Sequence, residues 1–165
     1  MTSWMLLTVG CAVLILLFLS ARLLRREFRV VTVFGESMVP SLANGERVLI
    51  RRCGVSGLSR GDIVVLHADR PLGWPKGRPV LLGEGVVIPL IKRVVALPGE
   101  RIPEDLDAAP GVFSGPVVPP DSVVVVGDNA RVSRDSRQYG HLPAEWVTGK
   151  MIRKLSSKED RAIAD

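Results

Sequence analysis

One serine, Ser37, lies in a segment whose composition could support nucleophilic chemistry. The segment reads VFGESMVPSL from Val33 to Leu42. A glycine at position 35 lets the backbone approach a bound substrate closely, and Pro40 stiffens the chain after the serine. A serine attacks a carbonyl only when a base takes its proton, and without such a base this residue is an ordinary loop hydroxyl. The segment therefore needs a partner elsewhere in the chain.

Lys92 is the candidate base. It lies within the apolar run VVIPLIKRVVAL over residues 86–97. Burial disfavours the charged form of a lysine and lowers its pKa, and a neutral amine can act as a general base. Strand alternation places Lys92 and Arg93 on opposite faces, so one of them faces the more apolar side. The sequence alone leaves open which one, and an outward-facing lysine is the alternative.

A third polar segment, GDNARVSRDSRQYG over residues 127–140, could complete the site. Asp135 and Arg137 can pair and brace a loop, while Ser133 and Ser136 offer hydroxyls that could orient a neutral amine. The composition predicts a loop rather than a strand or helix interior, and a solvated surface loop is the alternative. Ser37, Asp135 and His141 could also form a histidine-based triad, which is the competing arrangement.

The elements that must position these residues are mainly strands. Alternating or apolar β-rich segments predict strands at 29–34, 46–52, 62–67, 86–97, 122–126 and 145–155. Pro89 predicts a bulge or an edge position in the fourth of these. A Pro/Gly-rich connection is expected at 69–78, an excursion with little regular structure at 103–120, and a frayed tail after Ser156. The fold class is mainly β.

The 165 residues suffice for one domain and carry a net charge of +5. Aromatic residues are few, which argues against a nucleic-acid-binding surface. Two cysteines and two histidines predict neither a disulfide framework nor a metal site, and no cofactor is expected.

The first 21 residues have no charged side chain, and about 20 residues of helix cross a bilayer core. A cleaved signal peptide is the alternative, but no basic residue precedes the apolar run. We therefore expect a transmembrane anchor at 1–21 and a soluble domain at 22–165.

Four segments in order resemble type I signal peptidases, the membrane-anchored Ser/Lys proteases. They are GESMVPSL (35–42), RGDIVV (60–65), KRVVALPGE (92–100) and GDNARVSRDSRQYG (127–140), the last followed by LPAEWVTGK (142–150). The final segment is also similar to that of mitochondrial inner-membrane relatives. The resemblance implies a compact, largely antiparallel β domain after a single transmembrane helix, acting as a signal peptide-cleaving serine endopeptidase.

By this resemblance Ser37 is the nucleophile and Lys92 the general base. Ser133 matches a serine that hydrogen-bonds the lysine amine, and Asp128, Asp135 and Arg137 match supporting residues. The backbone N–H of Ser37 would serve the oxyanion hole. Gly35 stands where some members have a serine hydroxyl donor. The residues matching the substrate-binding surface are Val33, Gly35, Met38, Leu42 and Ile91.

The resemblance also implies the partners and the location. The substrates would be secretory precursors with small residues at −1 and −3, and the lipid bilayer would be the second partner. The protein would be single-pass in the cytoplasmic membrane with its catalytic domain outside. The charge pattern opposes this topology, because Arg22, Arg25, Arg26 and Arg29 follow the apolar segment and basic residues favour the cytoplasmic side. We nevertheless expect the catalytic domain outside the cytoplasm, because four ordered segments outweigh a statistical charge bias.

Three other functions are compatible with parts of the sequence. A self-cleaving Ser/Lys repressor would carry an N-terminal DNA-binding domain, where this chain has an apolar segment. A processing protease dedicated to one exported peptide, or to a pilin-like substrate, would share every motif. A non-catalytic, membrane-tethered peptide-binding β module would not need both Ser37 and Lys92.

Overall fold

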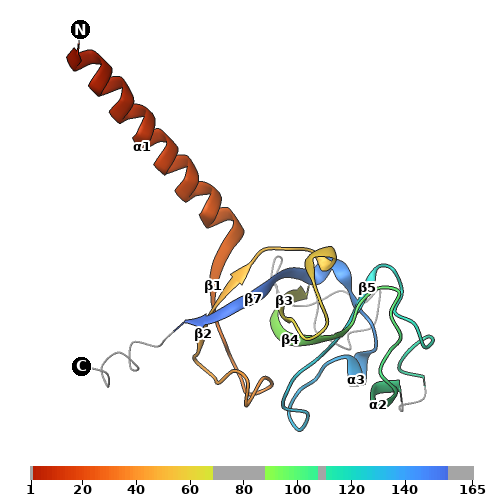
Figure 1. Cartoon of the computed structure of the whole chain (residues 1–165). Helices are drawn as coiled ribbons and strands as arrows, with labels where there is room; N and C mark the ends of the chain where they lie inside the picture. Colours follow the sequence, from red (N-terminus) through yellow and green to blue (C-terminus); the bar gives the residue numbers. More distant parts are fainter. Residues whose placement is uncertain (1, 69–87, 108–110, 156–165) are drawn as a thin grey trace.

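The computed structural model of the chain describes residues 2–68, 88–107 and 111–155. An N-terminal helix, α1 (Thr2–Glu27), projects away from a β domain and runs directly into its first strand (Figure 1). Within the described residues, no helix is at once long and apolar enough to cross a bilayer. The transmembrane anchor predicted at 1–21 is therefore not supported by the structure.

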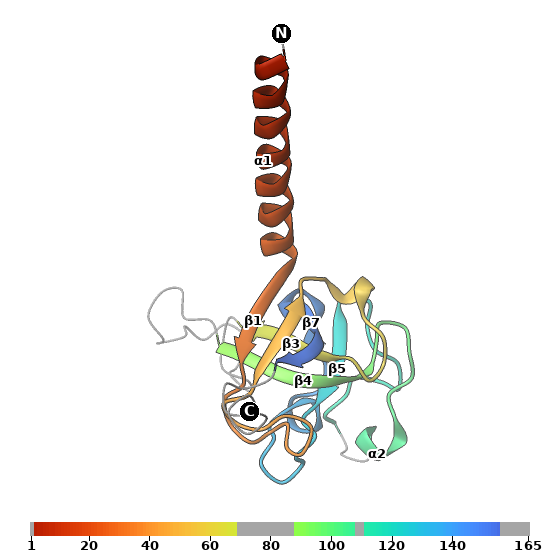
Figure 2. The ribbon, with the colours of Figure 1, turned by 60° about the vertical axis from the view of Figure 1, so that its left-hand side comes forward.

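A seven-stranded antiparallel sheet makes up the described part of the domain (Figure 2). Its strand order is β1-β2-β7-β3-β4-β5-β6. The strands are β1 (Phe28–Thr32), β2 (Arg47–Arg51), β3 (Ile63–Ala68), β4 (Ile88–Ala96), β5 (Ser122–Val126), β6 (Leu142–Pro143) and β7 (Val147–Leu155). The mainly β fold class predicted from the sequence is thus confirmed.

The six predicted strands all form. The strand at Ser122–Val126 has the predicted bounds, and the others differ by one or two residues at their ends. Pro89 lies where β4 is paired with β3 alone, because β5 pairs only with residues 93–96 of β4. The predicted edge position is therefore correct, and the irregularity in β4 lies between Val94 and Ala96 instead. The connection at 69–78 and the tail after Ser156 lie outside the described residues.

Short helical segments join the strands. They are η1 (Val55–Gly57), α2 (Glu104–Asp107), α3 (Ser136–Tyr139) and η2 (Ala144–Trp146). The segment 127–140, predicted as a loop, contains the single helical turn α3. Asp135 caps this helix and Gln138 completes a capping box, so the polar residues that argued for a loop satisfy the ends of a single helical turn.

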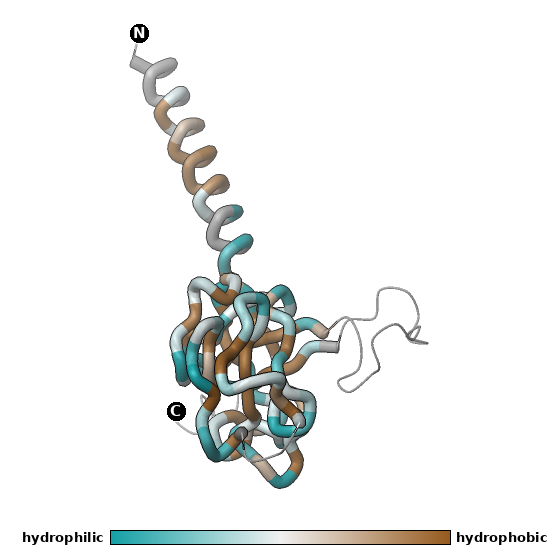
Figure 3. The backbone as a smooth tube through the Cα atoms, turned by 90° about the vertical axis from the view of Figure 1, so that its right-hand side faces the viewer, coloured by the Kyte–Doolittle hydropathy of each residue, from teal (hydrophilic) through white to brown (hydrophobic). Residues whose placement is uncertain are grey.

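Both faces of β3 are buried, and this produces two main cores. Val64 and Leu66 pack in a core with Val94, Val123, Val125 and Trp146. Ile63 and Val65 face the other way and join the core beneath the loop that carries Ser37; we call this the serine-loop core, and its buried members are Val33, Met38, Leu42, Val48, Ile50, Ile63 and Val65. The strands crossing the middle of the domain are accordingly hydrophobic (Figure 3). Burial of these side chains stabilises the frame that holds the site.

Candidate active site

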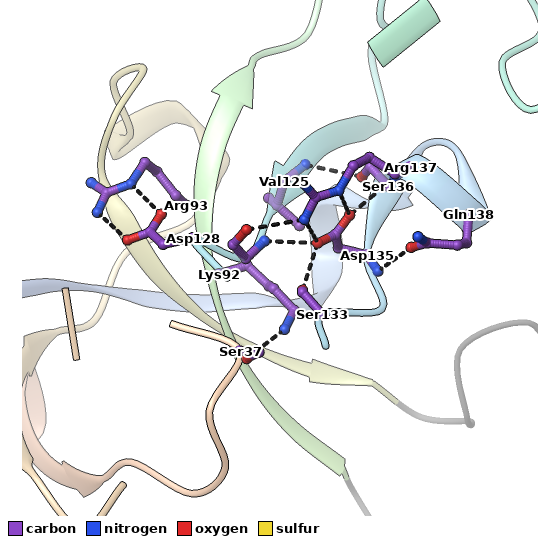
Figure 4. Close-up of polar contacts among 11 residues, drawn as sticks. Ser37, Lys92, Arg93, Val125, Asp128, Ser133, Asp135, Ser136, Arg137 and Gln138 are labelled. Carbon is purple, nitrogen blue, oxygen red and sulfur yellow. Dashed lines mark hydrogen bonds and ion pairs between the residues drawn. The ribbon is translucent and has the colours of Figure 1, made fainter. Parts of the chain in front are cut away.

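Ser37 and Lys92 meet although they are 55 residues apart in the sequence. Ser37 lies in the β1–β2 connection, and Lys92 lies near the middle of β4, opposite Val64 of β3. The Lys92 Nζ atom is 2.9 Å from Ser37 Oγ, and the two side chains point toward one another (Figure 4). This is the distance over which a hydroxyl proton can pass to an amine.

Lys92 is the residue of the Lys92–Arg93 pair that faces inward. Only 4% of Lys92 is exposed. Desolvation lowers the pKa of Lys92 below its ordinary value of 10.5, with Asp135 raising it and Arg137 lowering it by smaller amounts. No carboxylate is within salt-bridge distance of Nζ in the described part of the chain. The surroundings of Lys92 therefore favour a neutral amine.

Asp135 is the centre of a buried polar network next to Lys92. Its carboxylate accepts hydrogen bonds from the Ser133 hydroxyl at 2.6 Å, the Gly127 N–H at 2.8 Å, and the Arg137 backbone and guanidinium. Burial raises the pKa of Asp135, but the hydrogen bonds from Arg137, Gly127 and Ser133 together bring it below its ordinary value. Asp135 is thus held as a carboxylate with its lone pairs occupied, and the predicted Asp135–Arg137 pair is present.

The two predicted serine hydroxyls have different partners from those expected. The Ser133 hydroxyl donates to Asp135, and no hydrogen bond between Ser133 and Lys92 is found among the described residues. The Ser136 hydroxyl accepts from the Val125 N–H at 3.0 Å and so ties α3 to β5. Ser136 is a structural residue, whereas Ser133 lies between the Asp135 carboxylate and Lys92 (Figure 4).

Gly127 and Asn129 join the polar network to the serine loop. A Cβ atom at Gly127 would come within 2.2 Å of Ser133 Oγ and 2.5 Å of the Ser37 carbonyl oxygen. The Asn129 N–H donates to the Ser37 carbonyl at 3.0 Å, and its side-chain amide donates to the Glu36 carbonyl at 3.2 Å. The β5–α3 loop therefore packs directly on the backbone that carries the candidate nucleophile.

Arg93 and Asp128 form a second charged contact on the other side of β4. The guanidinium binds the Asp128 carboxylate through two hydrogen bonds, at 2.8 and 2.6 Å. Arg93 also donates to Ser41 Oγ at 3.1 Å and to the Gly61 carbonyl at 2.8 Å. Through Ser41, this contact connects the serine loop to the loop that begins at Gly127.

The predicted substrate-binding residues divide into buried and accessible groups. Val33, Met38 and Leu42 are almost fully buried in the serine-loop core, and Ile91 packs against the same core while half-buried. Gly35 is exposed and has a φ of +84°, a conformation that side chains with a Cβ rarely adopt. These residues surround Ser37, but the first three contribute to the support of its loop rather than to an open surface.

The backbone N–H groups near Ser37 include bound and unbound donors. The Gly35 N–H is bound to the Asn44 side-chain oxygen at 2.9 Å. The Ser37 N–H has no hydrogen-bond partner within the described residues. An unoccupied backbone N–H on the candidate nucleophile is what an oxyanion hole requires.

The histidine-based alternative does not form. The His141 ring packs edge-on against Phe113, with the ring centres 5.1 Å apart. Its Nε2 is buried without a hydrogen-bond partner in the part of the chain that the structure describes, and the hydrogen bonds of Ser37 and Asp135 go to other groups. Burial lowers the pKa of His141, as expected for a packed side chain without an acidic hydrogen-bond partner.

Three contributors to the site were not singled out from the sequence: Gly127, Asn129 and Arg93. The sequence indicates for Arg93 only that it faces the opposite side of the strand from Lys92. Two signals could have paired Arg93 with Asp128: its side chain faces away from that of Lys92, and the polar segment GDN at 127–129 offers a carboxylate. Close approach at Gly127 has no such signal in a single sequence.

The chain matches a family model described as "Signal peptidase, peptidase S26" over residues 1–109 and 103–155. It is 30% identical over 163 residues to Signal peptidase I of Leptolyngbya laminosa, which covers 88% of this chain and 75% of the relative. It is 26% identical over 156 residues to Signal peptidase IB of Staphylococcus aureus, covering 73% of each. The chain belongs to the S26 signal peptidase family. As a member of that family it is a serine peptidase and hence a hydrolase, which agrees with the resemblance noted in its four segments.

Proposed function

We propose that this signal peptidase homologue removes signal peptides from exported precursors, using Ser37 as nucleophile and Lys92 as general base. The observation that carries the proposal is the 2.9 Å contact between Lys92 Nζ and Ser37 Oγ in a buried setting that disfavours the ammonium form. A non-catalytic peptide-binding module would have no use for a lysine held without a counter-ion against a serine, because burying an amine costs stability.

In the first half of the reaction, neutral Lys92 takes the Ser37 proton as Oγ attacks the scissile carbonyl carbon. The resulting oxyanion is stabilised by the free Ser37 N–H. Collapse of the tetrahedral intermediate breaks the C–N bond, and the Lys92 ammonium returns its proton to the leaving amine. The mature protein leaves with a new N-terminus, and the signal peptide remains as an ester on Ser37.

In the second half, water replaces the leaving amine. Lys92 takes a proton from the water as its oxygen attacks the ester carbonyl, and collapse then breaks the bond to Ser37 Oγ. Ser37 recovers its proton from Lys92, and the signal peptide leaves with a new carboxylate. Asp135, Ser133 and Arg137 act by holding the surroundings of Lys92 in place.

The substrate preference is proposed from the resemblance of the segments around Ser37 and Lys92 to those of signal peptidases. We propose small residues at −1 and −3 of the precursor. Changing −1 from Ala to Phe should stop cleavage at that bond, and equal cutting of both precursors would disprove this preference.

We also propose that α1 holds the enzyme at the membrane, with the catalytic domain on the extracytoplasmic side. What supports membrane association is the exposed apolar surface of α1, whose side chains from Val9 to Leu19 have no cover from the β domain. Retention of the full chain in the pellet after alkaline carbonate treatment would support a spanning helix, and its release would overturn one. Protease treatment of spheroplasts carrying a C-terminal tag tests the side, since a protected tag would make the domain cytoplasmic.

The test of the function uses the detergent-solubilised full chain and a secretory precursor. Mass mapping of the products should give one cut, after a small residue, and the Ser37→Ala variant should give none. A protease dedicated to one exported peptide would leave unrelated precursors intact while cutting its own substrate. Absence of any cut in a panel of precursors would contradict signal peptide removal.

A further inference from the structure

Two arginines, Arg131 and Arg134, are exposed on the β5–α3 loop (residues 127–135), which contacts the backbone that carries Ser37. We propose that they bind an acidic side chain in the mature part of the precursor, shortly after the bond that is cut. The peptidase thereby prefers precursors with Glu or Asp at that place. This inference rests on the proposed function and adds a substrate preference to the same site.

The β5–α3 loop is fixed against the serine loop by main-chain hydrogen bonds. The Asn129 N–H donates to the Ser37 carbonyl at 3.0 Å. The Asn129 carbonyl in turn accepts from the N–H groups of Val132 and Ser133, at 3.3 and 3.0 Å, so the chain makes a tight turn at this contact. Arg131 follows Asn129 by two residues, which span at most about 7 Å. Arg131 therefore lies close to any peptide bound across Ser37.

The two arginines are on the outer side of the loop, away from the buried polar network. Ser133 and Asp135 are 4% and 0% exposed, whereas Arg134 between them is exposed. The exposed residues of the loop, which we call the loop rim, are Ala130, Arg131, Val132 and Arg134. A peptide that crosses the loop rim therefore meets two guanidinium groups and no carboxylate belonging to the rim.

The charges of these two arginines are not balanced by neighbouring acids. The carboxylates of the loop, Asp128 and Asp135, each bind another arginine of the domain. Arg131 and Arg134 form no ion pair among the residues that the structure describes, and the exposed Glu36 of the serine loop is not paired with either. Each guanidinium is thus available to a ligand, and its geometry matches a carboxylate through paired hydrogen bonds.

The pairing of β4 indicates where the signal peptide half of a precursor lies. β3 pairs with β4 over residues 88–93, but β5 pairs with β4 only over residues 93–96. In the described part of the chain, the second edge of residues 88–91 has no strand partner. An extended peptide can add to such an edge through main-chain hydrogen bonds. Ile91, which the family resemblance assigns to the substrate-binding surface, belongs to this segment, so we place the residues before the cut here.

The mature half then has to leave over the loop rim. A peptide on the free edge of residues 88–91 is in line with β5, which takes the same place in the sheet farther along β4. Gly127, directly after β5, is packed so closely on the serine loop that a Cβ atom there would come within 2.5 Å of the Ser37 carbonyl oxygen. The path along β4 is therefore closed beyond Lys92, and the chain after the cut turns outward across the loop rim.

An acidic side chain after the cut fits the loop rim in charge and geometry. Charges attract one another over roughly 8 Å at physiological ionic strength. An exposed ion pair changes a binding constant by up to about fivefold. With two arginines available, kcat/KM should be higher for Glu than for Gln by about fivefold, and higher for Glu than for Lys by about 20-fold.

The experiment compares precursors that differ at a single residue. The detergent-solubilised full chain, free of lipid, is given a secretory precursor with Ala at −1 and −3, in which Glu, Gln or Lys stands in turn at each position from +1 to +4, or at −4. We expect the preference for Glu at one or more of the mature positions and not at −4. The preference should fade in about 1 M salt, where charges are screened beyond about 3 Å.

Variants of the two arginines test their part in the preference. Arg131→Glu/Arg134→Glu should reverse it, so that Lys is favoured over Glu by about fivefold. Arg131→Lys/Arg134→Lys keeps both charges and should retain most of the preference for Glu. The matched control, Arg51→Glu/Arg153→Glu, changes the net charge equally at exposed positions of β2 and β7 and should leave the preference as it is. Circular dichroism checks that each variant is folded.

Equal cutting of the Glu, Gln and Lys precursors by the wild type would overturn the proposal, and binding of these arginines to lipid headgroups instead of precursor would give that result. A preference for Glu that survives Arg131→Glu/Arg134→Glu in a folded variant would also overturn it. An effect at −4 alone would contradict the assignment to the mature half. Cleavage of the Gln precursor reports on the proposed function itself. Cleavage without any charge preference refutes this inference alone, and no cleavage of any precursor refutes both.

Discussion

Lys92 and Arg93 are consecutive cations on one strand, and the fold treats them in opposite ways. Lys92 is buried, faces Ser37, and has a pKa lowered by desolvation. Arg93 faces the other side, binds Asp128 through two hydrogen bonds, and has a pKa raised by that contact. The side chain without a counter-ion is suited to exchange a proton, and the paired one is suited to hold loops together. Environment, rather than residue charge, assigns these roles.

Removing the Lys92 amine should have the largest effect. Lys92→Ala should lower kcat/KM by about 1000-fold or more, since a positioned base contributes about 100- to 10,000-fold. Lys92→Arg should fail equally, because a guanidinium stays charged and cannot accept the proton. The measurement is precursor cleavage by folded variants, and turnover by Lys92→Ala close to that of the wild type would make Lys92 a bystander.

Crowding the contact between the loop that carries Ser37 and the β5–α3 loop should have the second-largest effect on activity. Gly127→Ala would place a methyl group against Ser133 Oγ and the Ser37 carbonyl. We expect a loss of stability of about 1–3 kcal/mol from the overpacking, and a fall in kcat of up to about 100-fold because the nucleophile is displaced. Denaturant unfolding and single-turnover cleavage measure the two effects. Wild-type values for both would show that the loops can separate without consequence.

Arg93 should matter less than Lys92 and in a different way. Arg93→Lys removes the paired hydrogen bonds to Asp128 and should cost about 10-fold in kcat/KM through loosening of the serine loop. The apparent pKa of the pH profile should stay where it is, because Arg93 does not face Lys92. A shift of that pKa in the Arg93→Lys variant would erase the distinction between the two cations.

His141 should have the smallest effect on catalysis. Its ring packs on Phe113 and contacts neither Ser37 nor Asp135. His141→Ala should lose some packing energy while keeping most of the cleavage activity, and His67→Ala should behave similarly. Inactivity of a fully folded His141→Ala variant would restore the histidine-based triad as a competitor.

The strands and the candidate site residues could be predicted from the sequence, because they depend on local residue patterns. Alternation and apolar runs located six strands. The Gly/Pro frame singled out Ser37, the surrounding apolar run singled out Lys92, and the polar segment 127–140 singled out Asp135. Alternation also required Lys92 and Arg93 to face opposite sides, but it could not say which side was covered. That depended on the loop that carries Ser37 and the β5–α3 loop covering the face of β4 with Lys92, a long-range arrangement with no local signature.

The misses have the same origin. The polar residues at 135–139 were taken for a loop because short helices consist almost entirely of ends, where capping residues dominate the composition. The Ser133 hydroxyl was expected at the lysine amine, whereas the buried carboxylate of Asp135, a stronger acceptor, accepts its hydrogen bond. Close packing at Gly127 involves residues from two segments and becomes visible only in three dimensions.

The pH dependence of kcat/KM tests the role of Lys92 most directly. The free-enzyme profile reports the pKa of the essential base. Because burial lowers the pKa of Lys92, activity should be lost as the pH falls below that pKa and should be full above it, with the rise centred below the 10.5 of an ordinary lysine. The Arg93→Lys variant should give the same rise at lower amplitude. A flat profile from mildly acidic to alkaline pH, or a rise centred at 10.5 or above, would contradict a buried, neutral Lys92 as the base.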